Sequence, residues 1–242
     1  MARGQPDYGL TTRTPVASGI SDPGEAAARL GSINIYDRRG WTVWMDDFES
    51  PSLRWGVNSS AGSPDPVLST TRAWMGAQSV WIHIVAGAGE FSLMQRQFPL
   101  LRLGRVGVEF FIFMAQFLSA YMALRVNLYD GTNISQAELR LDSIARTATI
   151  VTPAGNIVVA TNAFNTVFNQ TWVPFKLVID MDTDRYVRLL LGPDEIDLSD
   201  HELVAGGGTT DRMIDITFNV ESPAGNAASV WLDNFILTQN EP

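Results

Sequence analysis

The stretch from residue 172 to 200, WVPFKLVIDMDTDRYVRLLLGPDEIDLSD, constrains the fold more than any other part of the chain. Residues 175–179 and 186–190 are two β-rich runs, and the polar residues 180–184 between them contain too little apolar surface to continue a strand. This pattern predicts a β-hairpin, followed after a Gly-Pro-Asp turn by a third short strand at 195–198. Three strands cannot bury their apolar face alone, so the rest of the chain must supply a second layer.

Further strands with turns between them run through most of the remaining sequence. Gly-Ala-Gly, Asp-Gly and Pro-Ala-Gly-Asn turns separate several of them, and this spacing is typical of an antiparallel sandwich. Loops are expected at 56–66 and at the triple glycine 206–208, and one helical turn at 164–170. The expected strands are 41–45, 79–86, 91–98, 105–114, 120–129, 136–142, 146–152, 156–161, 212–220 and 228–238.

The first 40 residues differ from the rest, because glycine and proline interrupt them before any apolar period is established. One short helix is expected at 22–31, with Asp22 as its N-cap, and it is too short to persist alone. We therefore predict two parts, an extended N-terminal arm at 1–40 that binds a partner and a single domain at 41–242. The arm residues expected to contact the partner are Tyr8, Leu10, Val16, Ile20, Leu30, Ile33, Ile35 and Tyr36.

Charge and composition exclude several classes of function. The net charge of −9 argues against binding of nucleic acid, whose phosphates require a basic face. The arm carries a net charge of +1 and the remainder −10, so the charge changes where we place the boundary. The chain has no cysteine, no signal peptide is recognisable at its start, and the apolar stretch 110–124 is too short to span a membrane.

Two acidic motifs lie at opposite ends of the predicted domain. The sequence Asp-Asp-Phe-Glu at 46–49 follows the first strand, and Trp-Leu-Asp-Asn-Phe at 231–235 lies in the last one. They resemble the first and last strands of concanavalin A-like (laminin-G-like) jelly rolls, in which those strands pair. The resemblance implies an all-β, antiparallel jelly-roll β-sandwich and a structural calcium ion with Asp47, Glu49 and Asp233 as its ligands. Alternatively, these carboxylates only cap strand ends.

The sequence contains few residue patterns that resemble a catalytic site. The run 195–200 resembles the catalytic strand of jelly-roll β-glucanases, with Glu195 and Asp197 as the carboxylate pair, but the last position is Asp200 instead of glutamate. A surface strand is the simpler interpretation. The acidic turn 180–184 fails the EF-hand pattern, and His83 and His201 lack the neighbours that a zinc site requires. We therefore expect no enzymatic activity.

Tryptophan side chains are the candidates for contact with glycans. The chain has seven, and most lie in apolar strands where a large ring is ordinary core. Trp55 and Trp74 lie beside the Gly/Pro-rich loop, so these two are the predicted glycan contacts.

The layout of an arm followed by a jelly roll resembles accessory virion proteins of tailed phages. That resemblance implies a non-enzymatic capsid decoration or tail-associated subunit, located on the virion, oligomeric and fastened to neighbouring subunits by its arm. The alternative is a carbohydrate-binding module that holds surface glycans, and the two functions are compatible.

Overall fold

The computed structural model describes part of the chain. The described residues are 36–37, 39–99, 104–114, 121–142, 145–162, 171–208, 212–222 and 225–242. The predicted helix at 22–31, the helical turn at 164–170 and every predicted arm contact except Tyr36 lie outside them. The boundary at residue 40 and the partner-binding arm therefore stay predictions.

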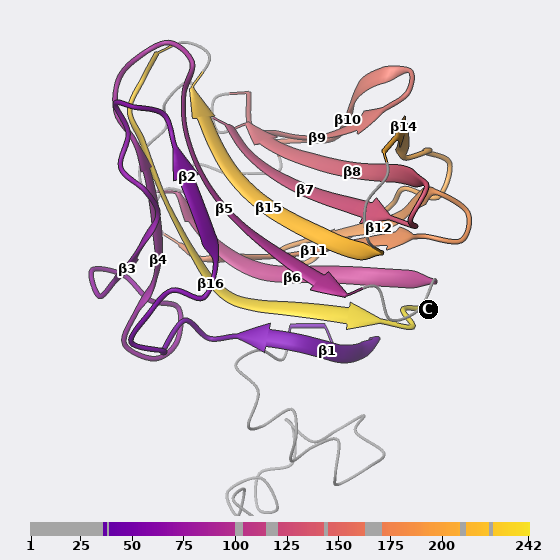
Figure 1. Ribbon diagram of the computed structural model, residues 1–242, viewed down its shortest axis with the longest axis horizontal. Coiled ribbons are helices and arrows are strands. Elements are labelled where there is room, and N and C mark those ends of the chain that lie inside the picture. Colours follow the sequence, from indigo (N-terminus) through magenta and orange to yellow (C-terminus); the bar gives the residue numbers. More distant parts are fainter. Residues whose placement is uncertain are drawn as a thin grey trace, which may run out of the picture. The chain divides into compact units, whose positions relative to one another are not determined.

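The described strands form two antiparallel sheets that face each other across one core, as the sequence predicts (Figure 1). Sheet A contains, in spatial order, β13 (Asp194–Asp197), β12 (Arg185–Leu191), β11 (Val173–Asp180), β6 (Arg105–Met114), β16 (Ala228–Gln239), β4 (Ser79–Ile84) and β3 (Val67–Ser69), with β1 (Trp41–Asp46) also paired to β16. Sheet B contains β10 (Gly155–Thr161), β9 (Thr147–Thr152), β8 (Asn133–Asp142), β7 (Tyr121–Tyr129), β15 (Met213–Ser222), β5 (Glu90–Pro99) and β2 (Gly56–Ser59), with β14 (Val204–Gly207) also paired to β8. No helix in these described ranges is long and apolar enough to cross a membrane.

The predicted hairpin is present as β11 and β12. Phe175 pairs with Leu191 at one end and Asp180 with Arg185 at the other, and β13 adds the third strand beside β12. β11 also pairs along its whole length with β6, which places the hairpin inside sheet A. Its apolar side is covered by sheet B, the second layer that the hairpin requires.

The first and last strands pair, as the resemblance to jelly rolls implies. Met45 of β1 lies opposite Ile236 of β16, and Asp46 lies opposite Phe235. On its other side β16 pairs with β6, and that ladder is interrupted between Asp233 and Ile236. The acidic residues at both ends of the domain are thereby brought to neighbouring strands.

Strand alternation sorts each strand into a core face and an outer face. In β6, Phe110 and Ile112 are buried in the core between the sheets, whereas Phe111 and Glu109 face outward from sheet A. On that outer face the side chain of Lys176 is fully buried. Its Nζ lies 2.7 Å from Oε1 of Glu241 and 3.7 Å from Oε2 of Glu109.

Three short strands are not among the expected ones. β2 lies in the expected loop 56–66, β3 follows that loop directly, and β14 includes the first two glycines of the run 206–208. Each pairs through its backbone with a longer strand, so it needs no apolar alternation of its own.

Sheet B is curved. Figure 1 shows that β5, β7, β8 and β15 bend in the same sense, and the outer face of sheet B is the inner side of this bend. We call this outer surface of sheet B the concave face.

Candidate functional site

The predicted glycan contact Trp55 is part of the core. Its side chain is only 6% exposed, and its ring lies 5.0 Å from that of Phe235 and 5.8 Å from that of Phe218. Its Nε1 donates a hydrogen bond of 3.1 Å to Oδ2 of Asp46. Burial among core aromatic rings leaves little of the indole exposed, so the structure gives no support to the prediction that Trp55 stacks on sugar rings.

Trp74 lies on the outer side of sheet A, away from the concave face. Its side chain is 44% exposed, and its ring stacks on Phe111 with the centroids 4.6 Å apart. Phe111 faces outward from sheet A because its neighbours Phe110 and Ile112 point into the core. The structure therefore does not bring the two predicted tryptophans together.

The three predicted calcium ligands bind backbone amides instead of converging on one point. Oδ2 of Asp233 accepts hydrogen bonds from the amides of Trp74 at 2.7 Å and Met75 at 3.4 Å. Oε1 of Glu49 accepts hydrogen bonds from two backbone amides further along the loop 70–78. Oδ1 of Asp47 accepts one from the Glu49 amide. No group of three or more acidic, histidine or cysteine side chains in the described ranges is placed to hold a metal. The carboxylates fit the alternative interpretation, in which they fasten the ends of strands and the loop 70–78.

Burial has a further consequence for Asp233. The side chain is fully buried, and this burial raises its pKa to about 7, with a smaller contribution from the nearby charge of Glu49. The amide hydrogen bonds oppose the shift without cancelling it. Asp233 therefore titrates near neutral pH, where an ordinary aspartate is fully ionised.

The glucanase-like carboxylates lie on an edge strand. Glu195 in β13 forms ion pairs with Arg39 at 2.9 Å and with Arg188 at 3.6 Å. Asp197 accepts a hydrogen bond from the Ser199 amide, which lowers its pKa. This arrangement supports the interpretation of 195–200 as a surface strand and turn.

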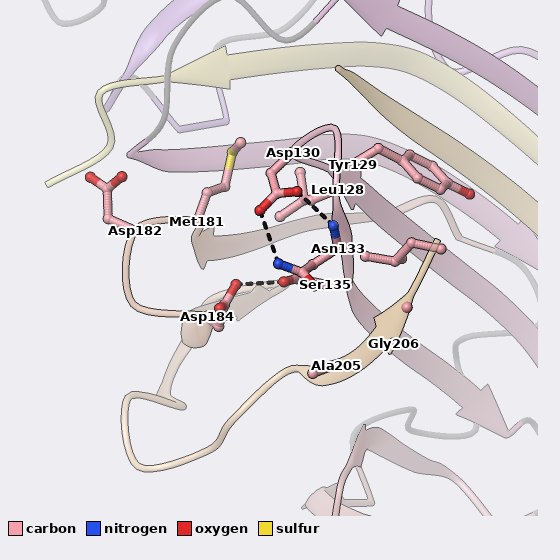
Figure 2. A pocket seen from close by; sticks show the side chains of 12 residues that line it. Leu128, Tyr129, Asp130, Asn133, Ser135, Met181, Asp182, Asp184, Ala205 and Gly206 are labelled. Atoms are coloured by element: carbon pink, nitrogen blue, oxygen red, sulfur yellow. Dashed lines mark hydrogen bonds between the residues drawn. The ribbon is translucent and has the colours of Figure 1, made fainter. Parts of the chain in front are cut away.

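A cavity of about 640 Å³ lies where the β7–β8 turn, the β11–β12 turn and β14 meet (Figure 2). Leu128 and Met181 supply apolar lining, and Asp130 and Asp184 lie at its polar edge. Asp130 binds the amides of its own turn, and Asp184 accepts a hydrogen bond of 2.6 Å from Ser135. Both of these carboxylates are engaged in holding the turns.

The concave face carries a group of polar side chains. In β7, β8 and β15 the apolar residues point into the core, so the alternate residues project from the concave face. The adjacent strands bring six of these residues into one group, which we call the concave cluster. Its members are Tyr121, Arg125, Glu138, Arg140, Asn219 and Glu221.

Ion pairs and hydrogen bonds connect the concave cluster. Nε of Arg125 lies 2.9 Å from Oε2 of Glu138, and its Nη2 lies 3.3 Å from Oε1 of Glu221. Arg140 donates from Nε to the other oxygen of Glu138 at 2.5 Å. The hydroxyl of Tyr121 donates to Oε2 of Glu221. These ion pairs hold each guanidinium group against a carboxylate and so fix the orientation of both side chains.

The pKa values in the cluster reflect burial and these charges. Burial raises the pKa of Tyr121 to about 12, and its hydrogen bond to Glu221 and the negative charge of Glu221 add to the shift. Burial opposes the charged form of Arg125, but its contacts with Glu138 and Glu221 outweigh this effect and raise its pKa. Tyr121 is therefore a neutral donor and Arg125 a permanent cation at neutral pH.

Asn219 presents a buried acceptor with no partner in the described part of the chain. Its side chain is 3% exposed, and its Nδ2 donates to Oε1 of Glu221. Because Glu221 can only accept, this bond fixes the orientation of the amide and turns Oδ1 away from Glu221. Oδ1 is buried and has no hydrogen-bond partner among the described residues.

A cavity of about 580 Å³ lies over this part of the concave cluster. Tyr121, Arg125, Asn219 and Glu221 line it together with Phe91 of β5. A buried polar group without a partner is costly, so an acceptor in such a place indicates a ligand that donates a hydrogen bond. The concave cluster is therefore the candidate binding site.

This site is not among those predicted from the sequence. A signal was available, because Asp215, Thr217, Asn219 and Glu221 are polar at every second position of one strand while the residues between them are apolar. The same alternation occurs at 136–142. These patterns predict one polar face on each strand, and only the fold shows that the faces adjoin.

Comparison with known proteins gives a similarity of fold. No protein-family model matches this sequence, and no curated protein matches it. Among solved structures, the cellulose induced protein Cip1 has a TM-score of 0.52 at 15% identity, with 81% of this chain and 96% of that chain covered. A galectin-like-fold protein of unknown function from Bacillus subtilis has a TM-score of 0.53 at 11% identity, with 84% and 97% covered. The endo-β-1,4-glucuronan lyase of Trichoderma reesei has a TM-score of 0.51 at 11% identity, with 83% and 96% covered.

These similarities agree with the predicted antiparallel jelly-roll β-sandwich. At such low identity they show the fold alone. They give no support to the predicted role as a capsid or tail subunit, nor to the predicted homo-oligomer.

Proposed function

We propose that this protein binds carbohydrate on the concave face of sheet B, with the concave cluster as its binding site. The observation that carries the proposal is Asn219, which lines a cavity of about 580 Å³ and whose buried Oδ1 has no hydrogen-bond partner among the described residues. Sugars present many hydroxyl groups, each of which can donate such a hydrogen bond. A glycan bound here would donate the hydrogen bond that Oδ1 of Asn219 does not receive from the described residues.

The form of the site supports a sugar ligand. The cavity falls within the size range of small-molecule sites, and the ion pairs hold its polar groups in place before a ligand arrives. Phe91 and Tyr121 supply rings at the cavity, where an apolar sugar face can pack. The name of one protein of similar fold, induced by cellulose, agrees with a carbohydrate ligand.

Binding without cleavage is part of the proposal. A glycosidase needs two carboxyl groups in different environments, one protonated and one ionised. Here Glu138 contacts both arginines of the concave cluster, and Glu221 contacts Arg125. Both carboxylates are engaged with guanidinium groups, which suits a fixed binding surface better than a catalytic pair.

A glycan array followed by calorimetric titration tests this function. The wild type is expected to bind at least one glycan, and Asn219→Ala to weaken that binding about tenfold or more, because the ligand hydroxyl loses its acceptor. Trp74→Ala is the matched control. It changes the outer side of sheet A, away from the concave face, and should leave the affinity unchanged. Circular dichroism and the melting temperature verify that both variants fold.

Two results would contradict the proposal. One is a wild type that binds no glycan at all. The other is loss of binding in Trp74→Ala with full binding in Asn219→Ala, which would move the site to the outer side of sheet A.

A further inference from the structure

We infer that the concave face selects uncharged glycan chains and rejects polyuronates. This inference rests on the proposed function and adds the chemical class of the ligand. It follows from the balance of charge on the concave face and from the kind of hydrogen bond that Asn219 requires.

Carboxylates outnumber guanidinium groups on the concave face of the described strands. By strand alternation, two arginines and four acidic residues project from it. They are Arg125, Arg140, Glu138, Asp142, Asp215 and Glu221. The cavity is also lined by Glu90, whose pKa is lowered by hydrogen bonds from Ser60 and Ser63, so another negative charge lies at its edge.

Both arginines of the concave cluster are already paired with carboxylates. Arg125 is already bound between Glu138 and Glu221. Arg140 is bound to Glu138, and its guanidinium carbon lies 5.4 Å from the centre of the Tyr121 ring. A uronate would have to compete with these carboxylates for each cation and would meet their negative charge in doing so.

Asn219 requires a ligand group that donates a hydrogen bond. Its Nδ2 is engaged with Glu221, so the group that it offers to a ligand is the acceptor Oδ1. A sugar hydroxyl donates to this atom, whereas an ionised carboxylate can only accept. At the sugar carbon where a uronate carries its carboxylate, a neutral hexose carries a hydroxyl and keeps the donor.

Matched oligosaccharides separate the two classes. The probes are hexasaccharides of β-1,4-glucan and β-1,3-glucan, each compared with the same hexasaccharide oxidised at C6 to the uronate. Affinities are measured by calorimetric titration in low salt and in about 0.3 M NaCl, which screens exposed charges. We expect a neutral hexasaccharide to bind with little dependence on salt, and its oxidised form to bind about tenfold or more weakly, with a smaller difference in high salt.

A charge variant tests the cause of the selectivity. Asp215→Asn removes one negative charge from the concave face, keeps the shape of the side chain and lies outside the concave cluster. It should strengthen binding of the oxidised hexasaccharide and leave the neutral one unchanged. Asp200→Asn, in an exposed turn, is the matched control and should change neither.

The outcomes distinguish this inference from the proposed function. An oxidised hexasaccharide that binds as tightly as its neutral form, or more tightly, would overturn the inference and leave glycan binding intact. If the wild type binds neither form of either hexasaccharide, nor any other glycan on an array, the proposed function and the inference both fail.

Discussion

Replacing Tyr186 by phenylalanine tests how the two sheets are joined beneath the concave cluster. Tyr186 lies in β12 of sheet A, and its side chain is fully buried. Its hydroxyl accepts a hydrogen bond of 2.9 Å from the amide of Glu138 and donates one of 2.8 Å to the carbonyl of Val151. The ladder between β8 and β9 ends one pair earlier, at Leu139 and Ile150. The hydroxyl therefore bridges the two strands where their own pairing ends.

The size of the effect follows from these two bonds. Phenylalanine fills nearly the same volume, so the substitution creates almost no cavity and isolates the loss of the hydroxyl. A buried backbone group left without a partner costs about 1–3 kcal/mol, so we expect Tyr186→Phe to lower the free energy of unfolding by about 3 kcal/mol. With an m-value of about 2 kcal/mol/M in urea, the unfolding midpoint falls by about 1.5 M.

Urea denaturation followed by tryptophan fluorescence and circular dichroism measures this change. Tyr129→Phe is the control, because Tyr129 is half-buried on the concave face and its hydroxyl makes no hydrogen bond within the described residues. It should lower the stability by less than about 0.5 kcal/mol. A loss of that small size in Tyr186→Phe, with an unchanged m-value, would refute the bridge between the sheets.

Three further predictions concern buried polar groups. The pKa of Asp233, about 7 in the folded protein, lies above its unfolded value of about 3.9, so its contribution to stability is complete below about pH 4 and is lost as the pH rises through 7. Between pH 4 and pH 8 the wild type should therefore lose up to about 4 kcal/mol more than Asp233→Asn in denaturation experiments. Lys176→Met removes the buried cation that lies 2.7 Å from Glu241 and 3.7 Å from Glu109, while Glu241 keeps its ion pair with Arg188, and we expect a loss of about 3–5 kcal/mol, measured as a lower urea midpoint. Trp55→Phe removes the hydrogen bond to Oδ2 of Asp46, whose Oδ1 still accepts from the Phe48 amide, and should cost about 1–3 kcal/mol without changing the affinity for glycans. A loss of glycan binding in this folded variant would restore Trp55 as a contact.

Most of the strands could be predicted from local signals. Alternation and turn residues located the hairpin of β11 and β12 and the long strands of both sheets. β2, β3 and β14 were missed because they are held by backbone pairing with longer neighbours, which leaves no apolar period in the sequence. The resemblance to jelly rolls correctly implied that β1 pairs with β16, although about 190 residues separate them.

The candidate site could not be predicted in the same way. The position of two tryptophans near a Gly/Pro-rich loop predicts that they contact sugar rings. In the structure Trp55 is enclosed in the core, and Trp74 stacks on Phe111 on the outer side of sheet A. The polar alternation of β15 is visible in the sequence. Its pairing with β7, which places Glu221 opposite Tyr121, joins segments about 100 residues apart. Which face becomes concave depends on the bend of the whole sheet, and no local pattern encodes it.

Nuclear magnetic resonance of the ¹⁵N-labelled protein gives the most direct test of where carbohydrate binds. A neutral glucan hexasaccharide that binds in calorimetry is titrated into the full chain, and the backbone and side-chain amide signals are followed. We expect the changes in amide chemical shift to concentrate in β7, β8 and β15, and the side-chain amide of Asn219 to show one of the largest changes. Shifts confined to β4, β6 and the loop that carries Trp74, with the Asn219 signal unchanged, would contradict it.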